Sequence, residues 1–478
     1  MGAVMSQDLW ELDAVGQAAL VKSGEVSALD LVDAAIARIE TLEPVVHALA
    51  SVDFDAAREK ARARPSGPLG GVPFLIKDVL AYPGHKLTMG SRLFRDYIAP
   101  AGSPYTEQLD AAGLVTLGKT TTSEFGLLGS TETLLAGITR NPWDLTKSAL
   151  GSSGGAAAAV ASGMVPVAHA SDGGGSIRIP ASACGLFGFK PGHKRCVPTG
   201  YVDTFELVID HCVSRSVRDS AFLLSLTEDP SAHPRVGYVD RPLDRKLRIG
   251  VYSTTLLGRA PDPEVMRALS QTMRLCADLG HEVVEAPPPP VDGVLLSEAF
   301  FDSAGAAMHE VVRTMESMLG RPVGEDDLEP FTLALIHHSR SLPEGAEARA
   351  KATVAHASAR MLSYMESYDV LLCPTLPVAP YDLGTLAPHL DRELLIRRTE
   401  VLAGYTPIYS MAGVPAMSVP LGSSESGLPL GSHFAAPLGQ EATLLGLAYQ
   451  LEAAAPWRHR WPAVTRATRE RASASVLG

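Results

Sequence analysis

One run of ten residues combines a candidate hydroxyl nucleophile with a row of glycines. Residues 171–180 read Ser-Asp-Gly-Gly-Gly-Ser-Ile-Arg-Ile-Pro, and the second serine, Ser176, could attack a carbonyl carbon. Glycines adopt positive φ without steric cost, so several backbone N–H groups can be directed at one point. Preorganised donors of this kind stabilise an oxyanion, and loss of one costs roughly 10²–10³ in rate. The run therefore favours acyl transfer, with an oxyanion hole formed by the N–H groups of Gly173, Gly174, Gly175 and Ser176.

Two upstream segments could supply the base that this chemistry requires. Residues 151–155 read Gly-Ser-Ser-Gly-Gly, and the small residues Ala156 to Gly163 that follow predict a tightly packed helix. Ser152 could therefore meet Ser176 in space. Further upstream, Lys77 ends an apolar run that indicates a buried strand. Because burial lowers the pKa of a lysine from its free value of about 10.4, Lys77 is a candidate base.

The order Lys77, Ser152 and Ser176, each in these surroundings, resembles the amidase signature hydrolases, whose catalytic set is Ser-cisSer-Lys. The resemblance extends over nearly the whole chain. Further landmarks are Arg38-Ile39-Glu40, Thr139-Arg140-Asn141-Pro142-Trp143, Cys184-Gly185, Phe189-Lys190-Pro191, Cys373-Pro374-Thr375, Gly413-Val414-Pro415-Ala416 and Gly427-Leu428-Pro429. The fold that it implies is α/β: a single large domain, 1–478, with a mixed, mostly parallel central β-sheet wrapped by α-helices.

The resemblance also implies a role for each residue of the site. Ser176 is the nucleophile, Ser152 relays protons and Lys77 is the base, with a cis peptide bond before Ser152. Asp172 and Arg178 flank the nucleophile, and an ion pair between them would hold the glycine loop. The expected reaction is hydrolysis of an amide C–N bond through an acyl-enzyme on Ser176, without a cofactor or a metal ion.

Some residues depart from the usual family pattern and favour one branch of it. Ala149-Leu150-Gly151 stands where a proline and two glycines are common, Gly173 where many relatives carry a larger residue, and Ser410 where asparagine is frequent. Gly173, with residues 183–189 and 431–436, resembles the branch that contains 6-aminohexanoate cyclic-dimer hydrolases and aryl acylamidases. This branch favours secondary amides as substrates: anilides, cyclic or oligomeric amides, and carbamates (urethanes).

Two alternative functions remain open at this stage. Gly151-x-Ser153-x-Gly155 matches the nucleophile elbow of α/β-hydrolases, which would make Ser153 the nucleophile of a Ser-His-Asp esterase with a histidine such as His433. Against this, an elbow follows a strand directly, and residues 144–148 do not have a strand pattern; the family resemblance instead gives Ser153 a scaffold role. The second alternative is an amidotransferase-type subunit that releases ammonia for a partner protein.

Local signals place helices and strands around these motifs. Ser27 and Asp30 form a capping-box pattern ahead of an amphipathic helix. Residues 247–285 predict a strand, a helix that opens at Asp262-Pro263, and a second strand, which together form a β-α-β unit. By resemblance, the domain divides into an N-terminal helical part (1–66), a signature core that carries the triad (67–225) and a variable region that shapes the acyl pocket (240–370).

Composition is typical of a globular enzyme. The chain has 478 residues, of which 46% are hydrophobic and 20% charged, with a formal net charge of −12 and no Lys/Arg cluster, which argues against a nucleic-acid partner. The five cysteines are odd in number and form no C-x-x-C pair, so neither a disulfide framework nor a zinc site is indicated. No 18-residue apolar window could span a membrane. We therefore expect a cytoplasmic enzyme that acts on a small-molecule substrate. A homodimer is compatible with these features.

Overall fold

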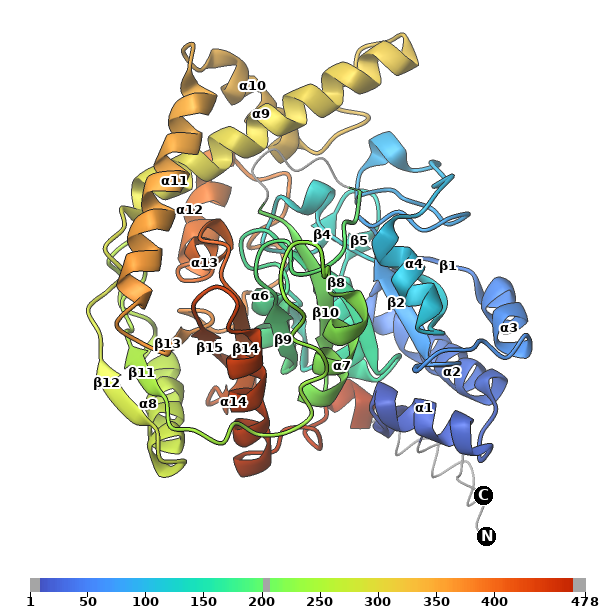
Figure 1. The fold of residues 1–478 in the computed structure, drawn as a ribbon. Helices are drawn as coiled ribbons and strands as arrows, with labels where there is room; N and C mark the ends of the chain where they lie inside the picture. The colour runs from blue at the N-terminus through green and yellow to red at the C-terminus, as the bar shows by residue number, and fades with distance from the viewer. Residues whose placement is uncertain (1–8, 201–206, 467–478) are drawn as a thin grey trace.

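An eleven-stranded mixed sheet forms the centre of the molecule, and helices pack around it (Figure 1). The computed structural model describes residues 9–200 and 207–466. Across the sheet the strand order is β1-β3-β2-β8-β10-β9-β14-β15-β13-β11-β12, so segments far apart in the sequence become neighbours. The prediction of one large α/β domain with a mixed central sheet is confirmed.

The strands that build this sheet come from most of the chain. Their bounds are β1 (Leu49–Val52), β2 (Pro73–Lys77), β3 (Val115–Thr120), β8 (Val167–Asp172), β9 (Phe187–Lys190), β10 (Ile209–Ser214), β11 (Arg248–Val251), β12 (Glu282–Glu285), β13 (Val370–Pro374), β14 (Ala416–Ser423) and β15 (Pro429–Ala435). Two small sheets pair β4 (Glu132–Thr133) with β5 (Gly137–Ile138) and β6 (Arg140–Asn141) with β7 (Asp144–Ser148).

The direction of the strands corrects one detail of the prediction. In the described sheet β2 runs parallel to β3 and β8, and β11 runs parallel to β12 and β13. The remaining pairs are antiparallel and outnumber the parallel ones: β1–β3, β8–β10, β10–β9, β9–β14, β14–β15 and β15–β13. The expected predominance of parallel pairs is therefore wrong. The physical reason is that short connections such as residues 424–428, between β14 and β15, can only join antiparallel neighbours.

The helices are distributed along the whole chain. Their bounds are α1 (Ala14–Ser23), α2 (Ala28–Val46), α3 (Phe54–Arg62), α4 (Pro104–Ala111), α5 (Gly154–Ser162), α6 (Arg178–Cys184), α7 (Val217–Thr227), α8 (Pro263–Asp278), α9 (Gly293–Leu319), α10 (Pro330–Ser341), α11 (Ala346–Met365), α12 (Arg392–Leu402), α13 (Pro407–Met411) and α14 (Glu441–Ala454). Short 3₁₀ turns are η1 (Leu9–Glu11), η2 (Arg92–Phe94) and η3 (Glu124–Gly126).

The local signals read from the sequence are present in the fold. The hydroxyl of Ser27 accepts from the backbone N–H of Asp30, and the Asp30 carboxylate accepts from the backbone N–H of Ser27, so α2 begins with a capping box. The segment from β11 through α8 to β12 forms the predicted β-α-β unit with parallel strands.

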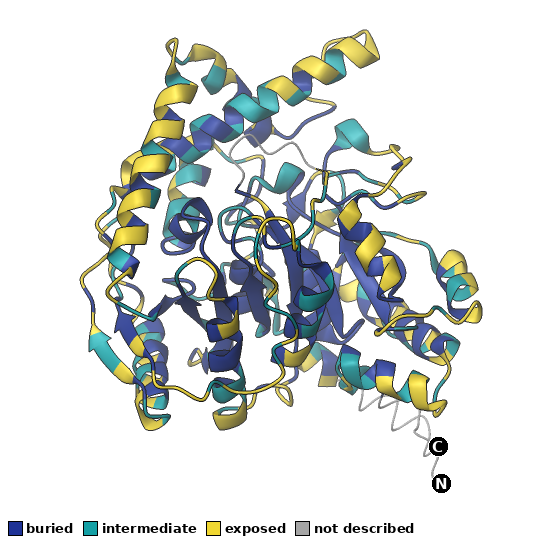
Figure 2. Ribbon diagram, viewed as in Figure 1, coloured by how far each residue is buried: buried dark blue, intermediate teal, exposed yellow. Residues whose placement is uncertain are grey.

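The elements around Lys77 and the first glycine-serine segment are fully buried. Every residue of β2 and β8 is buried, and so is every residue of α5, which consists of alanine, glycine, serine and valine only. Small side chains let α5 approach the sheet closely. Figure 2 shows this dark central layer beneath partly exposed outer helices such as α9 and α11. Lys77 and Ser152 thus lie in the buried interior of the protein.

Candidate active site

Lys77 lies at the carboxyl end of β2 with its side chain inside the protein, where only 1% of the residue is exposed. Its Nζ donates to the Oγ of Ser152 at 2.7 Å and to the Oγ of Ser171 at 3.0 Å. The backbone N–H of Lys77 donates to Nδ1 of His169 at 3.3 Å on the neighbouring strand β8. The predicted contact between Lys77 and Ser152 is therefore present as a direct hydrogen bond.

Burial lowers the pKa of Lys77 to about 7, although the carboxylates of Asp210 and Asp172 act in the opposite direction and raise it. No carboxylate among the described residues forms an ion pair with the Nζ atom of Lys77. Near neutral pH a large share of Lys77 is consequently uncharged. A neutral amine that faces a hydroxyl can accept its proton.

Ser152 lies in the loop between β7 and α5, directly after a cis peptide bond that joins it to Gly151. The hydroxyl of Thr131 holds this loop in place, because it donates to the carbonyl oxygens of Leu150 at 2.9 Å and Ser152 at 3.3 Å. The cis bond expected from the family resemblance is thus found at the expected position.

Ser176 precedes α6 and lines the same cavity as Lys77 and Ser152. Its carbonyl oxygen accepts from the backbone N–H of Ser153 at 3.3 Å, which ties the two glycine-serine segments together. Within the described part of the chain, the Ser176 hydroxyl takes part in no hydrogen bond, with Ser152 or any other group. Ser176 therefore presents an uncommitted hydroxyl to the cavity.

Hydrogen bonds within the glycine loop before Ser176 show which of its N–H groups are free to bind an oxyanion. The N–H of Gly175 donates to Oδ1 of Asp172 at 2.7 Å and is already occupied. The N–H groups of Gly173, Gly174 and Ser176 have no acceptor among residues 9–200 and 207–466. Gly175 shapes the loop instead: its φ is 136°, and a Cβ there would lie 2.3 Å from Oγ1 of Thr406. Because its N–H is occupied by Asp172, Gly175 is removed from the predicted oxyanion donors.

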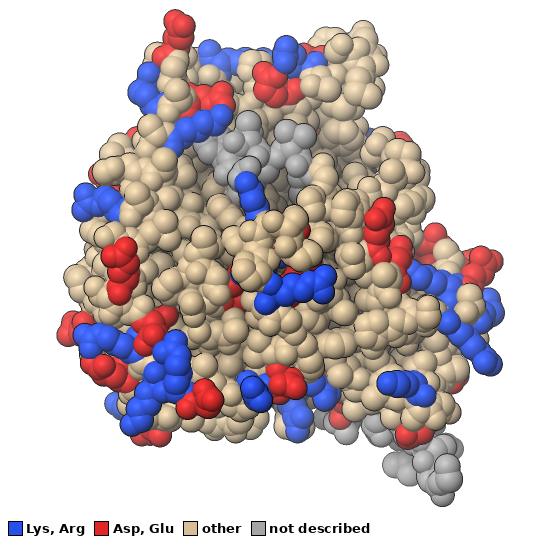
Figure 3. All heavy atoms as spheres, viewed as in Figure 1, with Lys and Arg blue, Asp and Glu red and all other residues tan. Residues whose placement is uncertain are grey.

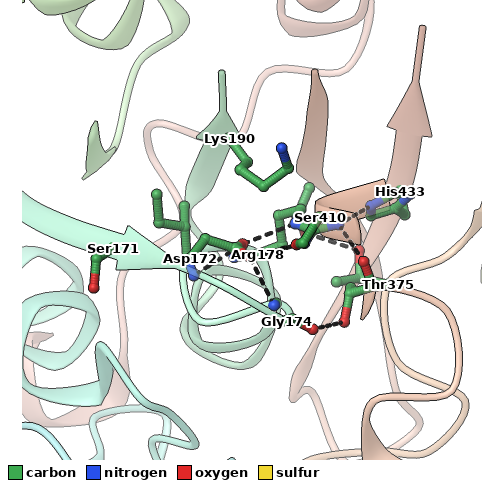
Figure 4. Close-up of polar contacts among 12 residues, drawn as sticks. Ser171, Asp172, Gly174, Arg178, Lys190, Thr375, Ser410 and His433 are labelled. Atoms are coloured by element: carbon green, nitrogen blue, oxygen red, sulfur yellow. Dashed lines mark hydrogen bonds and ion pairs between the residues drawn. The ribbon is translucent and has the colours of Figure 1, made fainter. Parts of the chain in front are cut away.

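Asp172 and Arg178 form a fully buried ion pair behind the glycine loop (Figure 4). Nε of Arg178 donates to Oδ2 of Asp172 and Nη2 donates to Oδ1, both at 2.8 Å. Burial alone would raise the pKa of Asp172, but the Arg178 guanidinium holds that pKa well below its usual range. The remaining Arg178 donors reach Thr406, Ser410 and His433. The predicted pair is thus part of a larger buried network.

The geometry around Ser153 does not suit a nucleophile. Its Oγ donates to the carbonyl of Ser171 at 3.2 Å and accepts from the N–H of Ser171 at 3.3 Å, and Ser153 does not line the cavity. Nε2 of His433 faces Nη1 of Arg178 at 2.9 Å, and since an arginine can only donate, that nitrogen must accept. The expectation that residues 144–148 form no strand is wrong, because they form the five-residue strand β7. This strand pairs with the two-residue strand β6, and both lie outside the central sheet.

A comparison with known protein families decides the identity. The family model described as Amidase matches residues 30–445. The chain belongs to the amidase signature family. AmiC of Mycobacterium tuberculosis (strain ATCC 25618 / H37Rv), which is named as an amidase, is 38% identical over 475 residues, which cover 95% of this chain and 97% of that protein.

Two solved structures resemble this amidase along nearly its full length. The 6-aminohexanoate cyclic dimer hydrolase complexed with substrate has a TM-score of 0.86 and 33% sequence identity, and the match covers 96% of this chain and 100% of that one. A bacterial aryl acylamidase of the same family has a TM-score of 0.83 and 27% identity, with coverage of 93% and 96%. These findings confirm the predicted family and branch, and this amidase is a hydrolase that acts on amide C–N bonds.

Sequence reasoning missed three residues of the amidase site. Ser171 accepts from Lys77, and His169 links the backbone of Lys77 to Asp210, which lies 2.9 Å from Nε2 of His169. Alternate residues of a strand share one face of the sheet, so His169 and Ser171 lie on the same face of β8, which is the neighbour of β2. The alternation was visible in the sequence, but which strand lies beside β8 was not.

The cavity that contains Lys77, Ser152 and Ser176 has a volume of about 340 Å³. This size is in the range of small-molecule sites. Most of its lining is apolar or glycine, and it includes Met89, Phe125, Leu127, Leu128, Ile179, Leu207, Leu256, Leu257, Leu296, Phe300, Phe301, Met308 and Met411. From the region 240–370, Leu256, Leu257 and several residues between 293 and 308 line the cavity, while further lining residues between 399 and 411 lie outside that region.

Further features of the described residues concern metal-binding clusters, disulfides, membrane-spanning helices and charged surface patches. No group of three or more His, Cys, Asp or Glu side chains in ranges 9–200 and 207–466 is arranged to hold a metal ion, and all five cysteines are free. No described helix combines the length and the apolar character that a membrane crossing requires. On the face shown in Figure 3, acidic and basic side chains are intermixed and separated by uncharged surface.

Proposed function

We propose that this amidase hydrolyses secondary amides through an acyl-enzyme on Ser176, with Ser152 as the proton relay and Lys77 as the base. The observation that carries the proposal is the buried hydrogen bond of 2.7 Å between Nζ of Lys77 and Oγ of Ser152, at a cavity that Ser176 also lines. A lysine with a pKa of about 7 can cycle between its two protonation states near neutral pH.

In the acylation step, neutral Lys77 accepts the proton of Ser152, and Ser152 takes the proton of Ser176 as the Ser176 Oγ bonds to the carbonyl carbon. The N–H groups of Gly173, Gly174 and Ser176 are the candidate donors to the oxyanion. The tetrahedral intermediate then breaks its C–N bond, and the leaving amine takes a proton through Ser152. This leaves an ester on Ser176 and Lys77 neutral again.

In the deacylation step, water attacks the ester carbonyl and loses its proton along the same path. The C–O bond to Ser176 breaks, Ser176 recovers its proton through Ser152, and the carboxylic acid leaves. Ser171 contributes to both steps as a positioning residue. Its Oγ accepts a hydrogen of Lys77 at 3.0 Å and so holds the amine beside Ser152, where the lone pair of the neutral form can accept the Ser152 proton.

The apolar lining supports a substrate with aryl or alkyl groups on the amide. Anilides, cyclic or oligomeric amides and carbamates all present a carbonyl to Ser176 next to such groups. The similar proteins named for cyclic-dimer and aryl-amide substrates favour the same class. Glutamine, with its primary amide and its α-carboxylate, suits this lining less well, so we do not propose ammonia release for a partner protein.

Two measurements on the purified protein alone test the proposed function. A panel of anilides, cyclic amides, carbamates and primary amides should show fastest turnover for secondary amides with apolar substituents. A fluorophosphonate should label one residue, and peptide mapping should find the label on Ser176. Label on Ser153, or ammonia release from glutamine that requires an added protein, would contradict the proposal.

The acid limb of the pH profile should follow the ionisation of Lys77. Protonated Lys77 cannot accept a proton, so log kcat/KM should rise with pH below about 7 and level off above it, because the pKa of Lys77 is about 7. An anilide without ionisable groups is the appropriate substrate. A profile that stays flat down to pH 5 would contradict Lys77 as the base.

A matched variant tests the cause of that pKa. Asp210 is buried beside His169, and its carboxylate raises the pKa of Lys77. Asp210→Asn keeps the shape and an acceptor for His169 but removes the negative charge. We expect the acid limb to move to lower pH in this variant, whereas a shift to higher pH, or none, would contradict the electrostatic assignment.

A further inference from the structure

The cavity contains one acidic side chain that the proposed mechanism does not use. Glu400 on α12 lines it, and apart from Lys77 no other charged residue contributes to the lining as described. The hydroxyl of Ser297 on α9 donates to Oε1 of Glu400 at 2.7 Å. No basic side chain in the described ranges forms an ion pair with Glu400, so the second carboxylate oxygen is available to a ligand.

A second uncommitted polar atom lies on the same helix. Oγ1 of Thr399 is buried and has no hydrogen-bond partner, and Thr399 also lines the cavity. Because this oxygen is closed off from the cavity, a ligand there cannot contact it, and it is not counted among the ligand-binding groups. Glu400 and Ser297 together form a polar region, which we call the acidic subsite, in an otherwise apolar wall.

The position of the acidic subsite relative to the glycine loop follows from α9. The ring of Phe300 lies 3.6 Å from where a Cβ on Gly174 would be, so this residue of α9 contacts the candidate oxyanion loop. Ser297 precedes Phe300 by one turn, which is roughly 4.5 Å along the helix axis. The acidic subsite is therefore separated from the reacting groups by apolar wall, which includes Leu296 and Phe300.

We propose that the acidic subsite binds an ammonium group of the substrate, joined to the scissile amide by an apolar spacer. Glu400 is only partly exposed and lies in a largely apolar wall, so water screens its attraction to a cation less than it would on an open surface. An ammonium can donate to the free oxygen of Glu400 and to the hydroxyl oxygen of Ser297. The assignment of this ligand as a substrate rests on the proposed function.

Direct binding tests the acidic subsite without requiring turnover. In a Ser176→Ala background, calorimetry should show that pentylammonium binds more tightly than the neutral pentanol. Glu400→Gln in that background, which conserves shape, should weaken pentylammonium by about tenfold to a hundredfold, as expected for the loss of a hydrogen bond to a charged group. Glu393→Gln, on the exposed side of the same helix α12, is the matched control and should retain the affinity.

Kinetics then test whether the bound ammonium belongs to the substrate. The p-nitroanilides of δ-aminovaleric acid and hexanoic acid differ only by an ammonium in place of a methyl group; a second pair carries the ammonium on the amine side. For at least one pair, the ratio of kcat/KM for the cationic to the neutral substrate should fall about tenfold or more in Glu400→Gln and stay constant in Glu393→Gln.

The outcomes separate this inference from the proposed function. Equal pentylammonium affinity with and without Glu400, or unchanged kinetic ratios for both pairs, would overturn the acidic subsite even if amides are hydrolysed. If the wild-type protein hydrolyses no amide but binds pentylammonium through Glu400, the subsite is supported as a cation-binding site and the proposed function is refuted.

Discussion

Replacing Ser176 with alanine is expected to lower kcat for an anilide by at least about 10⁴-fold, because members of a catalytic set act as a unit. The Ser176 hydroxyl is not hydrogen-bonded within the described chain, so its removal should leave folding intact. Turnover and the thermal unfolding midpoint of the purified variant check both parts. An active Ser176→Ala enzyme together with an inactive Ser153→Ala enzyme would favour the nucleophile-elbow alternative.

Companion variants show whether the three residues act together. Ser152→Ala and Lys77→Met should each cost several orders of magnitude, and the double variant of Ser152 and Ser176 should be hardly less active than Ser176→Ala alone. Full additivity of the two losses in free energy would contradict a single proton path through Ser152. If the three residues act as one path, the residual rate of each variant reflects only substrate binding and the oxyanion donors.

Asp172→Asn is expected to lower the free energy of unfolding by about 3–5 kcal/mol, because it leaves the Arg178 guanidinium buried without its counter-charge. Both side chains of this pair are 0% exposed, so water cannot replace the lost partner. Urea unfolding of the variant and the wild type measures the difference. Activity should fall as well, since the Asp172 carboxylate also accepts from Gly175 and so shapes the loop before Ser176.

An exposed ion pair provides the control for this stability effect. Glu310 and Arg313 on α9 contact each other at 2.5 Å, with side chains 61% and 71% exposed. Glu310→Gln should change the free energy of unfolding by only about 0–1 kcal/mol, because solvent screens such pairs. Similar small losses in Asp172→Asn and Glu310→Gln would show that the buried pair is not a determinant of stability.

The same pKa that makes Lys77 a base also makes it a stability determinant. The pKa of Lys77 is lowered from 10.5 to about 7 in the folded protein, so between these values the unfolded chain binds more protons than the folded one. Stability therefore rises with pH across this window, at up to about 1.4 kcal/mol per pH unit from this group. Burial of the base thus lowers stability most at the acidic side, where Lys77 must be charged inside the protein.

Local chemistry was readable without coordinates because it depends on neighbours in the chain. The Ser27–Asp30 capping box, the small-residue helix α5 and the β11-α8-β12 unit all rest on contacts or periodicities within short segments. The motif at residues 171–180 and the order of Lys77, Ser152 and Ser176 further identified the family. These features are fixed by residue type and spacing, whatever the rest of the chain does.

The sheet and the cavity could not be derived in this way. Strand direction depends on pairing between distant segments, so the predominance of antiparallel pairs was missed. The occupied N–H of Gly175 follows from where the Asp172 side chain turns, which no spacing reveals. His169 and Ser171 became part of the site only because β8 lies beside β2, and Glu400 only because the fold brings it within hydrogen-bond distance of Ser297 on α9.

The sequence by itself therefore determined which groups can react, and the tertiary structure decided which of them meet and in what surroundings. A lysine becomes a base only when its ammonium is removed from water, and that removal depends on every element packed around β2. For the same reason the candidate ligand of the acidic subsite is a property of the folded cavity, since Ser297 and Glu400 are far apart in the chain and 2.7 Å apart in the protein.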